Sequence, residues 1–411
     1  MQINLNSHIS NDTPATKRLI NKIKQRSQCY LCYKYNYTPK ENNTYQLFSE
    51  GNQFYPAMLE AIDKAQSYVY IIQYIFETGL TSEKFINTLV KARQRDVEIR
   101  MILDAYGSKQ LSVQERQRLH NAGIQVYFFN PLRNHHLIKF LYRDHRKLLV
   151  VDGENAFIGG AGICDDYNFP LEHPQSWQDI VVKITGPLAL DSAYLFQQQR
   201  RLNQKEITDC NEKISASSLI LNAEQGRLLT SKTWHHNEIQ RAILHAIRKA
   251  KHRVWITTPY FVPTRKLRSR LKAAAHRGCD VRLLLPGTSS DHPWVSHIAR
   301  QRYSRMLKNN INIFEYQSRF THAKAILCDD WVCIGSSNLD RWNQKFNLEL
   351  NIEIQSAQLT KQLCNFFKQN FTNSKKIDKQ RWKSRPRSQK IKEWFWSKVA
   401  MWIERFMHSI R

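Results

Sequence analysis

The sequence predicts an α/β protein made of two pseudo-symmetric lobes, each a mixed β-sheet flanked by helices, with an amphipathic helix at the C-terminal end. Three observations support this fold class. The two halves repeat one order of expected helices and strands, and each half carries one His-x-Lys-x4-Asp motif. With 411 residues and 42% hydrophobic content, the chain is also long enough for two cores of ordinary size.

The repeat sets the expected domain boundaries. It is far longer than the units of about 20 to 50 residues that build solenoids, so two paired lobes are expected rather than a stack. Residues 204–233 are polar and lack periodicity, which is typical of a linker. The predicted organisation is a polar N-terminal arm at 1–45, a first lobe at 46–203, the linker at 204–233, a second lobe at 234–373 and a basic tail at 374–411.

The first lobe opens with a predicted helix at 55–65, where apolar residues recur at helical spacing and a proline stands in the first turn. The aliphatic and aromatic run at 69–76 predicts a strand. A second helix ends near Asp96 and leads into a strand at 98–103. Residues 119–129 then predict the end of a helix followed by a third strand.

The second lobe repeats this order. A predicted helix at 239–250 precedes a strand at 254–261, and a helix that ends at Gly278 leads into a strand at 280–285. Residues 307–316 again predict the end of a helix and a strand. Helices and strands that alternate in this way predict α/β layers with a mixed sheet in each half.

Both motifs are predicted to lie on a buried strand that runs into a hairpin, because aliphatic residues follow the histidine and a turn signal ends the run. Side chains two apart on a strand share a face, so His145 lies beside Lys147 and His322 beside Lys324. An ammonium group beside a histidine repels a metal cation and attracts a phosphate oxygen. The pattern therefore favours phosphate chemistry without a metal ion or other cofactor, at one cleft where the lobes meet.

Each motif ends on an aspartate, Asp152 in the first lobe and Asp329 in the second. Both follow a predicted strand directly. We therefore expect them to shape the catalytic site as turn or ion-pair residues, without touching the phosphate.

Four further segments accompany the two motifs: Ile158-Gly159-Gly160, the Ile-Gly-Ser-Ser-Asn-Leu-Asp run at 334–340, the Pro-Tyr-Phe-Val-Pro run at 259–263, and Asn347-Leu348-Glu349. With them, residues 45–372 resemble the phospholipase D superfamily, and within it the bacterial cardiolipin synthases without N-terminal transmembrane helices. The resemblance implies phospholipase D-type lobes that share one active site, no metal ion, and a covalent phosphohistidine intermediate.

The chain departs from the family pattern in two places. Where the family commonly has asparagine three residues after the first glycine, the second lobe has Asn338 but the first has Gly162. The turn between the motif aspartate and the next glycine is also one residue shorter in the second lobe. A one-residue deletion at a hairpin tip is usually tolerated, because the flanking strands set the register, so we expect activity despite both departures.

Attack on a phosphodiester needs a nucleophile, positive charge at the non-bridging oxygens and an acid for the leaving alkoxide. One imidazole is expected to attack while the other protonates the leaving group, since a histidine pKa near 6.5 allows both forms near neutrality. Lys147 and Lys324 are expected to hold the phosphate. The open, glycine-rich surroundings of the first motif and the family resemblance both favour His145 as the nucleophile and His322 as acid and base.

Four more residues are predicted to support the site. A nucleophilic histidine needs its second nitrogen held, normally by a carboxylate or a carbonyl group. Asp179 and Glu349 occupy matching places in the repeat, and the resemblance supports them as the orienting carboxylates. A surface charge at a strand edge remains the alternative for either one. Ser336 and Asn338 follow His322 in the sequence and are expected to help bind the phosphate.

The charge balance predicts a polyanionic partner. The chain has 62 Lys and Arg against 35 Asp and Glu, a formal net charge of +27. Nucleic acid and an anionic membrane both fit this charge. Neither a secretory signal nor an apolar run of spanning length is found in the sequence, so we expect a peripheral protein on the cytoplasmic face of a bacterial inner membrane.

The tail favours the membrane over nucleic acid. After a basic segment, apolar residues follow helical spacing from residue 391 onward, with Trp394, Phe395, Trp402 and Phe406 on the predicted apolar face. An aromatic face next to basic residues is typical of a helix that lies in the membrane interface. Docking of this helix on the protein's own core is the alternative.

Together these features predict a membrane-surface phosphatidyltransferase that joins two phosphatidylglycerol molecules into cardiolipin and glycerol. A hydrolytic phospholipase D, or a phosphodiesterase or nuclease with the same paired site, is the alternative enzyme. An inactive membrane or nucleic-acid adaptor is a third possibility, but it would not need both His-Lys pairs. The sequence leaves open whether the donor is phosphatidylglycerol or phosphatidylethanolamine, which other alcohols are accepted, and the oligomeric state.

Overall fold

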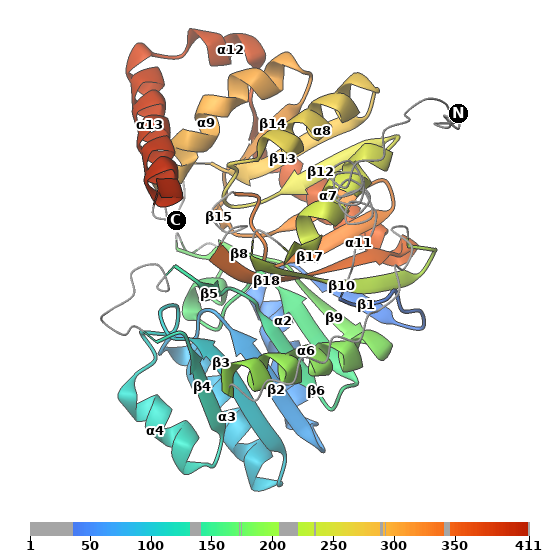
Figure 1. Cartoon of the computed structure of the whole chain (residues 1–411), viewed down its shortest axis with the longest axis vertical. Helices are drawn as coiled ribbons and strands as arrows, with labels where there is room; N and C mark the ends of the chain where they lie inside the picture. The colour runs from blue at the N-terminus through green and yellow to red at the C-terminus, as the bar shows by residue number, and fades with distance from the viewer. Residues whose placement is uncertain are drawn as a thin grey trace, which may run out of the picture.

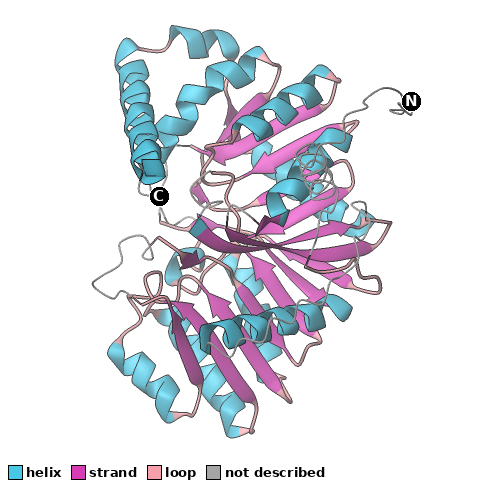
Figure 2. Cartoon of the chain, viewed as in Figure 1, coloured by secondary structure: helices cyan, strands magenta, loops and turns pink. Residues whose placement is uncertain are grey.

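The computed structural model describes residues 36–131, 141–171, 173, 175–204, 221–233, 236–287, 291, 293–340 and 346–409. Two lobes of similar build lie against each other in Figure 1, the first in blue to green and the second in yellow to red. Figure 2 shows the strands running through the middle of the molecule and most helices toward its edges. The predicted fold class, two α/β lobes with a C-terminal helix, is confirmed.

A seven-stranded mixed sheet forms the first lobe. Its parallel strands β2, β3 and β4 lie at one side, and antiparallel strands complete the other side. In sheet order the strands are β1 (Thr44–Phe48), β9 (Val181–Thr185), β7 (Asn155–Gly159), β6 (Leu148–Val151), β2 (Tyr68–Gln73), β3 (Glu98–Asp104) and β4 (Gln125–Phe129).

The second sheet repeats this topology and adds one strand at each edge, β11 beside β10 and β19 beside β14. Its parallel trio is β12, β13 and β14, and antiparallel strands again follow on the other side. In sheet order the strands are β11 (His236–Asn237), β10 (Gln225–Thr233), β18 (Asn347–Gln355), β17 (Trp331–Gly335), β16 (Ala325–Cys328), β12 (Arg253–Thr257), β13 (Asp280–Pro286), β14 (Asn312–Tyr316) and β19 (Ser374–Lys376).

The helices and sheets enclose three apolar cores. One core lies between the first sheet and α2 (Gly51–Asp63), α3 (Leu80–Gln94) and α4 (Val113–Asn121). A second lies between the other sheet and α7 (Glu238–Lys249), α8 (Arg265–His276) and α9 (Pro293–Lys308). The third is shared by both sheets with α6 (Pro187–Gln204) and α11 (Ala357–Thr372). Because the lobes share this core, burial of apolar area holds them together.

The predicted linker is too long. Residues 225–233 form β10, which pairs with β18 along seven residues and is the counterpart of β1. The strand looks polar in sequence, but its polar side chains have buried partners. The Arg227 guanidinium donates to the Glu353 carboxylate at 2.7 Å, and the Thr230 hydroxyl donates to the Glu238 carboxylate at 3.1 Å. Paired polar groups are buried at little cost, so polarity alone misidentifies this strand.

Two predicted strands also end earlier than expected. The strand predicted at 69–76 ends at Gln73, and the strand predicted at 254–261 ends at Thr257. The chain leaves the sheet at these points, and Tyr74 and Tyr260 then turn toward the two motif histidines, with ring centroids 4.8 and 6.3 Å from His145 and His322. The apolar pattern continues because Phe76 and Phe261 at the ends of the two runs are buried, although they lie outside these strands.

Short strands also cross between the lobes. β5 (Arg143–Asp144) of the first lobe pairs in parallel with the start of β18, and β15 (Phe320–Thr321) of the second lobe pairs in parallel with β8 (Trp177–Gln178). Each crossing continues into a motif. The His145 amide donates to the Leu348 carbonyl at 3.0 Å, and the His322 amide donates to the Gln178 carbonyl at 2.7 Å. Both histidines are therefore fixed by backbone bonds to the opposite lobe.

Candidate active site

The two His-Lys pairs lie just outside the strands on which they were predicted. His145 and Lys147 stand between β5 and β6, and His322 and Lys324 stand between β15 and β16. The predicted continuous strand is therefore wrong, because the backbone before each lysine pairs with the other lobe instead of its own sheet. All four side chains are buried.

Each histidine is held by a carboxylate from the opposite lobe. The His145 Nδ1 lies 3.0 Å from Glu349 Oε1, and the His322 Nδ1 lies 2.7 Å from Asp179 Oδ2. Both carboxylates are completely buried. A carboxylate on Nδ1 fixes the proton there and leaves Nε2 as the basic, nucleophilic nitrogen. The sequence identifies both carboxylates but does not indicate this exchange between lobes.

The two lysines lie close to the same groups. Lys147 Nζ donates to the His145 carbonyl at 2.7 Å, and Lys324 Nζ lies 3.1 Å from His322 Nε2. Lys324 Nζ is also 3.7 Å from Asp179 Oδ2. An ammonium group beside a reactive imidazole nitrogen is suited to hold an anionic phosphoryl oxygen.

Burial makes the site sensitive to added charge. Burial and the positive lysines lower the pKa of His145 well below its usual value, and burial with Lys324 lowers the pKa of His322 to about 4. Burial also lowers the pKa of Lys147 to about 7 and raises the pKa of Glu349 to about 8. The electrostatic attraction between Lys147 and Glu349 opposes both shifts. The site therefore favours neutral imidazoles, and an entering phosphate anion stabilises the ammonium groups.

The surroundings of the two carboxylates differ. The Ser336 hydroxyl donates to Glu349, and the Asn347 amide donates to it at 3.4 Å. Around Asp179 this place is taken by Gly160, where a Cβ atom would lie 2.4 Å from Asp179 Oδ1. Ser336 was expected to help bind the phosphate; its hydroxyl binds the carboxylate that holds His145, and a contact between Ser336 and the phosphate stays a prediction.

Asn338 stays a predicted phosphate contact. Its side chain is buried, and Oδ1 has no hydrogen-bond partner among the residues that the structure describes. The oxygen and nitrogen of an amide are assigned by the hydrogen bonds around them. A side-chain amide whose oxygen has no hydrogen-bond partner can rotate so that its NH2 group donates to an incoming anion.

Aromatic side chains surround both histidines, and two of them had no signal in the sequence. The Tyr167 hydroxyl lies 2.9 Å from His322 Nδ1, and the Trp177 ring centroid lies 5.5 Å from that of His322. In the first lobe, Lys147 Nζ lies 5.1 Å from the Tyr74 ring centroid. Tyr167 and Trp177 belong to the first lobe and reach His322 only through the β8–β15 pairing, which the sequence does not reveal.

Asp152 and Asp329 hold turns rather than reacting groups. The Asp152 carboxylate accepts the backbone amides of residues 66 to 68 at 2.8 to 2.9 Å. Asp329 accepts those of residues 251 to 253 at the same distances. Both aspartates have a left-handed backbone, with φ of 54° and 51°. Each side chain ties the hairpin after its motif to the strand beside it.

Replacing Asp329 with Ala should lower the free energy of unfolding by about 1 to 3 kcal/mol, because three backbone amides lose their acceptor and alanine disfavours positive φ. Asp329→Asn should lose less, since asparagine keeps one oxygen and tolerates this conformation. Urea denaturation measures both values. The folded fraction of either variant should retain turnover within about threefold; a catalytic loss as large as that of a motif histidine would contradict the turn role.

The pKa of His322 predicts a pH-dependent stability. Its pKa is about 4 in the folded chain and about 6.5 when unfolded, so the unfolded chain binds the extra proton between these values. The stabilising contribution is therefore complete above pH 6.5 and is lost as the pH falls toward 4. Compared with His322→Asn, the native protein should lose on the order of 2 kcal/mol more over this interval. Parallel stability curves for the two proteins would contradict it.

The tail forms α13 (Arg387–Ser409), which packs against α9 along the edge of the second lobe (Figure 1). Two of the four residues predicted to face a membrane, Trp394 and Phe395, are 54% and 53% exposed. The side chains of Trp402 and Phe406 lie outside the described residues. The helix is thus docked on the protein, as the alternative had it, yet keeps exposed aromatic side chains. Across the described part of the chain, every helix is too short or too polar to cross a bilayer.

Comparison with known proteins agrees with this geometry. Residues 58–185 and 243–371 match a family model described as cardiolipin synthase, PLD-like domain. Cardiolipin synthase B of Salmonella typhimurium is 32% identical over 332 residues, which cover 77% of each chain. Cardiolipin synthase 1 of Staphylococcus epidermidis is 29% identical over 365 residues, which cover 86% of this chain and 73% of that one. Each matched segment contains one His-x-Lys-x4-Asp motif.

A solved structure shows the same fold. The phosphatidylserine synthase of Haemophilus influenzae superposes with a TM-score of 0.71, covering 94% of this chain and 98% of that chain. Only 13% of the aligned residues are identical. This likeness therefore concerns the two-lobed architecture alone.

Proposed function

The chain belongs to the cardiolipin synthase family of enzymes built from PLD-like domains, and from this premise we propose that it joins two phosphatidylglycerol molecules into cardiolipin and glycerol through a covalent phosphohistidine. The observation that carries the proposal is the exchange of carboxylates between the lobes. It produces two buried imidazoles at one site, each with Nδ1 held and each next to an ammonium group.

The first step forms a phosphorus–nitrogen bond. Nε2 of His145 attacks the phosphorus of one phosphatidylglycerol, the bond to the glycerol headgroup breaks, and His322 donates a proton to the leaving alkoxide. The pKa values support this division of roles. Burial and nearby lysines lower the pKa of both histidines, that of His145 well below its usual value and that of His322 to about 4, where Asp179 and Asp291 oppose the shift. A bound phosphodiester anion also raises the pKa of His322, so His322 is the group that gains and donates the proton.

The second step reverses the roles. A headgroup hydroxyl of a second phosphatidylglycerol loses its proton to His322 and attacks the phosphorus, and the bond to His145 breaks. Cardiolipin is released and both imidazoles return to their starting state. Lys147 and Lys324 hold the non-bridging oxygens throughout, where developing negative charge is best stabilised by groups already in place.

A product assay tests this function. Purified protein incubated with phosphatidylglycerol vesicles should form cardiolipin and glycerol in equal amounts, measured by lipid mass spectrometry and an enzymatic glycerol assay. Turnover should persist in EDTA, because Lys147 and Lys324 lie beside the two histidines and become the positive groups that hold the phosphate once its anion enters the site. Release of phosphatidic acid in place of cardiolipin would show a hydrolase, and cleavage of DNA without lipid turnover would show a nuclease. Phosphatidylethanolamine tested as the donor determines the remaining substrate question.

The proposed location of the enzyme at a membrane follows from the exposed aromatic and basic residues of its tail. Exposed Trp394 and Phe395 on α13 lie next to the basic segment at 375–392. Aromatic residues insert at the level of the headgroups, and each nearby basic residue contributes on the order of 1 kcal/mol at an anionic surface. We place the protein peripherally on the cytoplasmic face of a bacterial inner membrane.

A further inference from the structure

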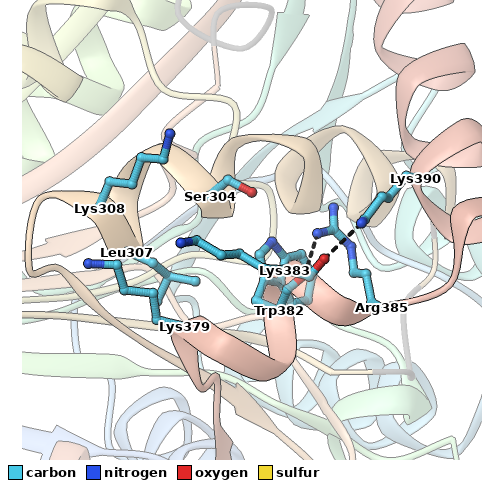
Figure 3. Close-up of a pocket in the computed structure, with 8 residues that line it drawn as sticks. All are labelled: Ser304, Leu307, Lys308, Lys379, Trp382, Lys383, Arg385 and Lys390. Atoms are coloured by element: carbon cyan, nitrogen blue, oxygen red, sulfur yellow. Dashed lines mark hydrogen bonds between the residues drawn. The ribbon is translucent and has the colours of Figure 1, made fainter.

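A basic cavity lies in the second lobe, on the side where the tail packs. It has a volume of about 310 Å³. Figure 3 shows the side chains around it, which come from α9, from α12 (Lys379–Ser384) and Arg385 directly after it, and from the start of α13. The lining residues are Ser304, Leu307, Lys308, Lys379, Trp382, Lys383, Arg385 and Lys390. Five of the eight carry positive charge, and none carries negative charge.

The cavity has a fixed wall. The Arg385 guanidinium lies 4.0 Å from the centre of the Trp382 ring, which packs against Tyr303 with a centroid distance of 5.0 Å. Arg385 also pairs with Glu393, whose side chain is buried. Asp378 caps α12 by accepting two backbone amides at 2.7 and 2.9 Å. These contacts hold the tryptophan and arginine in place without a ligand.

One buried donor in this wall has no partner. Trp382 Nε1 is buried and makes no hydrogen bond among the described residues. An indole N–H that is removed from water without an acceptor costs about 1 to 3 kcal/mol. The Trp382 side chain lines the cavity, so a small rotation of its ring would let an anionic oxygen in the cavity accept this donor.

We propose that this cavity binds a phosphate group, and specifically the headgroup phosphate of an anionic phospholipid. The tail favours a lipid as the source of the phosphate. Lys390 lines the cavity, and Trp394, four residues further on, shares its side of α13 and is exposed. A headgroup held by the lysines therefore places its acyl chains beside Trp394. The proposal rests on the membrane association proposed above and not on the transfer chemistry.

Vesicle binding tests the proposal. The full chain is compared with Lys379→Ala/Lys383→Ala, with Trp382→Phe, and with the matched control Lys266→Ala/Lys272→Ala, which removes the same charge from exposed positions on α8. On phosphatidylglycerol vesicles near 0.1 M salt, the cavity double variant should bind about tenfold more weakly and Trp382→Phe about threefold more weakly. The control should stay within twofold. Binding of all three variants to phosphatidylcholine vesicles should equal that of the native chain.

Three outcomes would overturn it. The first is equal loss of binding in the cavity and control double variants, which would mean that only total charge matters. The second is native binding by both cavity variants. The third is a cavity that binds soluble glycerol phosphate as tightly as vesicles, which would make free phosphate the ligand. Turnover of phosphatidylglycerol dispersed in detergent should be unchanged in every variant, so a failure of the proposed catalytic function remains distinguishable from a failure of this site.

Discussion

The His145→Asn variant should form no detectable cardiolipin, a loss of about 10⁴-fold or more, because asparagine offers no nucleophile for the phosphorus. His322→Asn should lose a similar factor in overall turnover, since the alkoxide then leaves without a proton. The matched control is His276→Asn, an exposed histidine on α8, which should retain full activity. Lipid mass spectrometry after incubation with phosphatidylglycerol measures all three.

The two inactive variants differ in what they accumulate. His322→Asn keeps the nucleophile and slows breakdown of the intermediate, so a phosphatidyl group should be trapped on His145. Peptide mass spectrometry after acid-free quenching locates the modified residue. An adduct on His322 in the His145→Asn protein, with none on His145 in the reciprocal variant, would reverse the two roles.

Glu349→Gln should lower the rate of adduct formation on His145 by about 10² to 10⁴-fold, because the amide no longer fixes the tautomer or stabilises positive charge on the ring. Asp179→Asn should act on His322 instead and slow protonation of the leaving group. Asp330→Asn, which changes an exposed carboxylate of the second lobe, serves as the matched control and should leave turnover unchanged.

A donor with an acidic leaving group separates these effects. Phosphatidyl-p-nitrophenol needs no proton at its leaving oxygen, so Asp179→Asn and His322→Asn should both release a normal first burst of p-nitrophenol. Glu349→Gln and His145→Asn should not. If Glu349→Gln instead behaves like His322→Asn, each carboxylate acts within its own lobe and the exchange seen in the structure has no catalytic meaning.

The sequence predicted the residues of this site more completely than their arrangement. The duplicated motif identifies His145, Lys147, His322 and Lys324 because residue types and spacing are local properties. The match of Glu349 to His145 depends on where β5 meets β18, which is a contact between residues about 200 positions apart. Periodicity within a strand carries no information about such a pairing, so the crossing appears only in the folded molecule.

The same limit explains the errors in the fold. Polar residues at 225–233 predict a linker, but Arg227 on β10 is paired with Glu353, which lies 126 positions away in the chain. Ser336 follows His322 in the chain, and its hydrogen bond to Glu349 is a contact that the sequence does not indicate. In both cases a hydrogen bond to a partner outside the local segment determines where the polar group lies. The local sequence does not reveal that partner.

The crossed strands also affect the order in which the protein is made. When the first lobe has left the ribosome, β5 and β8 have no partners, and Asp179 has no histidine to bind. Translation proceeds at about 5 to 20 residues per second, so roughly 10 to 30 s pass before the segment with Glu349 has been added. The face of the first sheet that packs into the shared core is exposed during this time. The chain is therefore most exposed to aggregation when the first lobe has been made and the second has not. Chaperone binding should matter most at this stage.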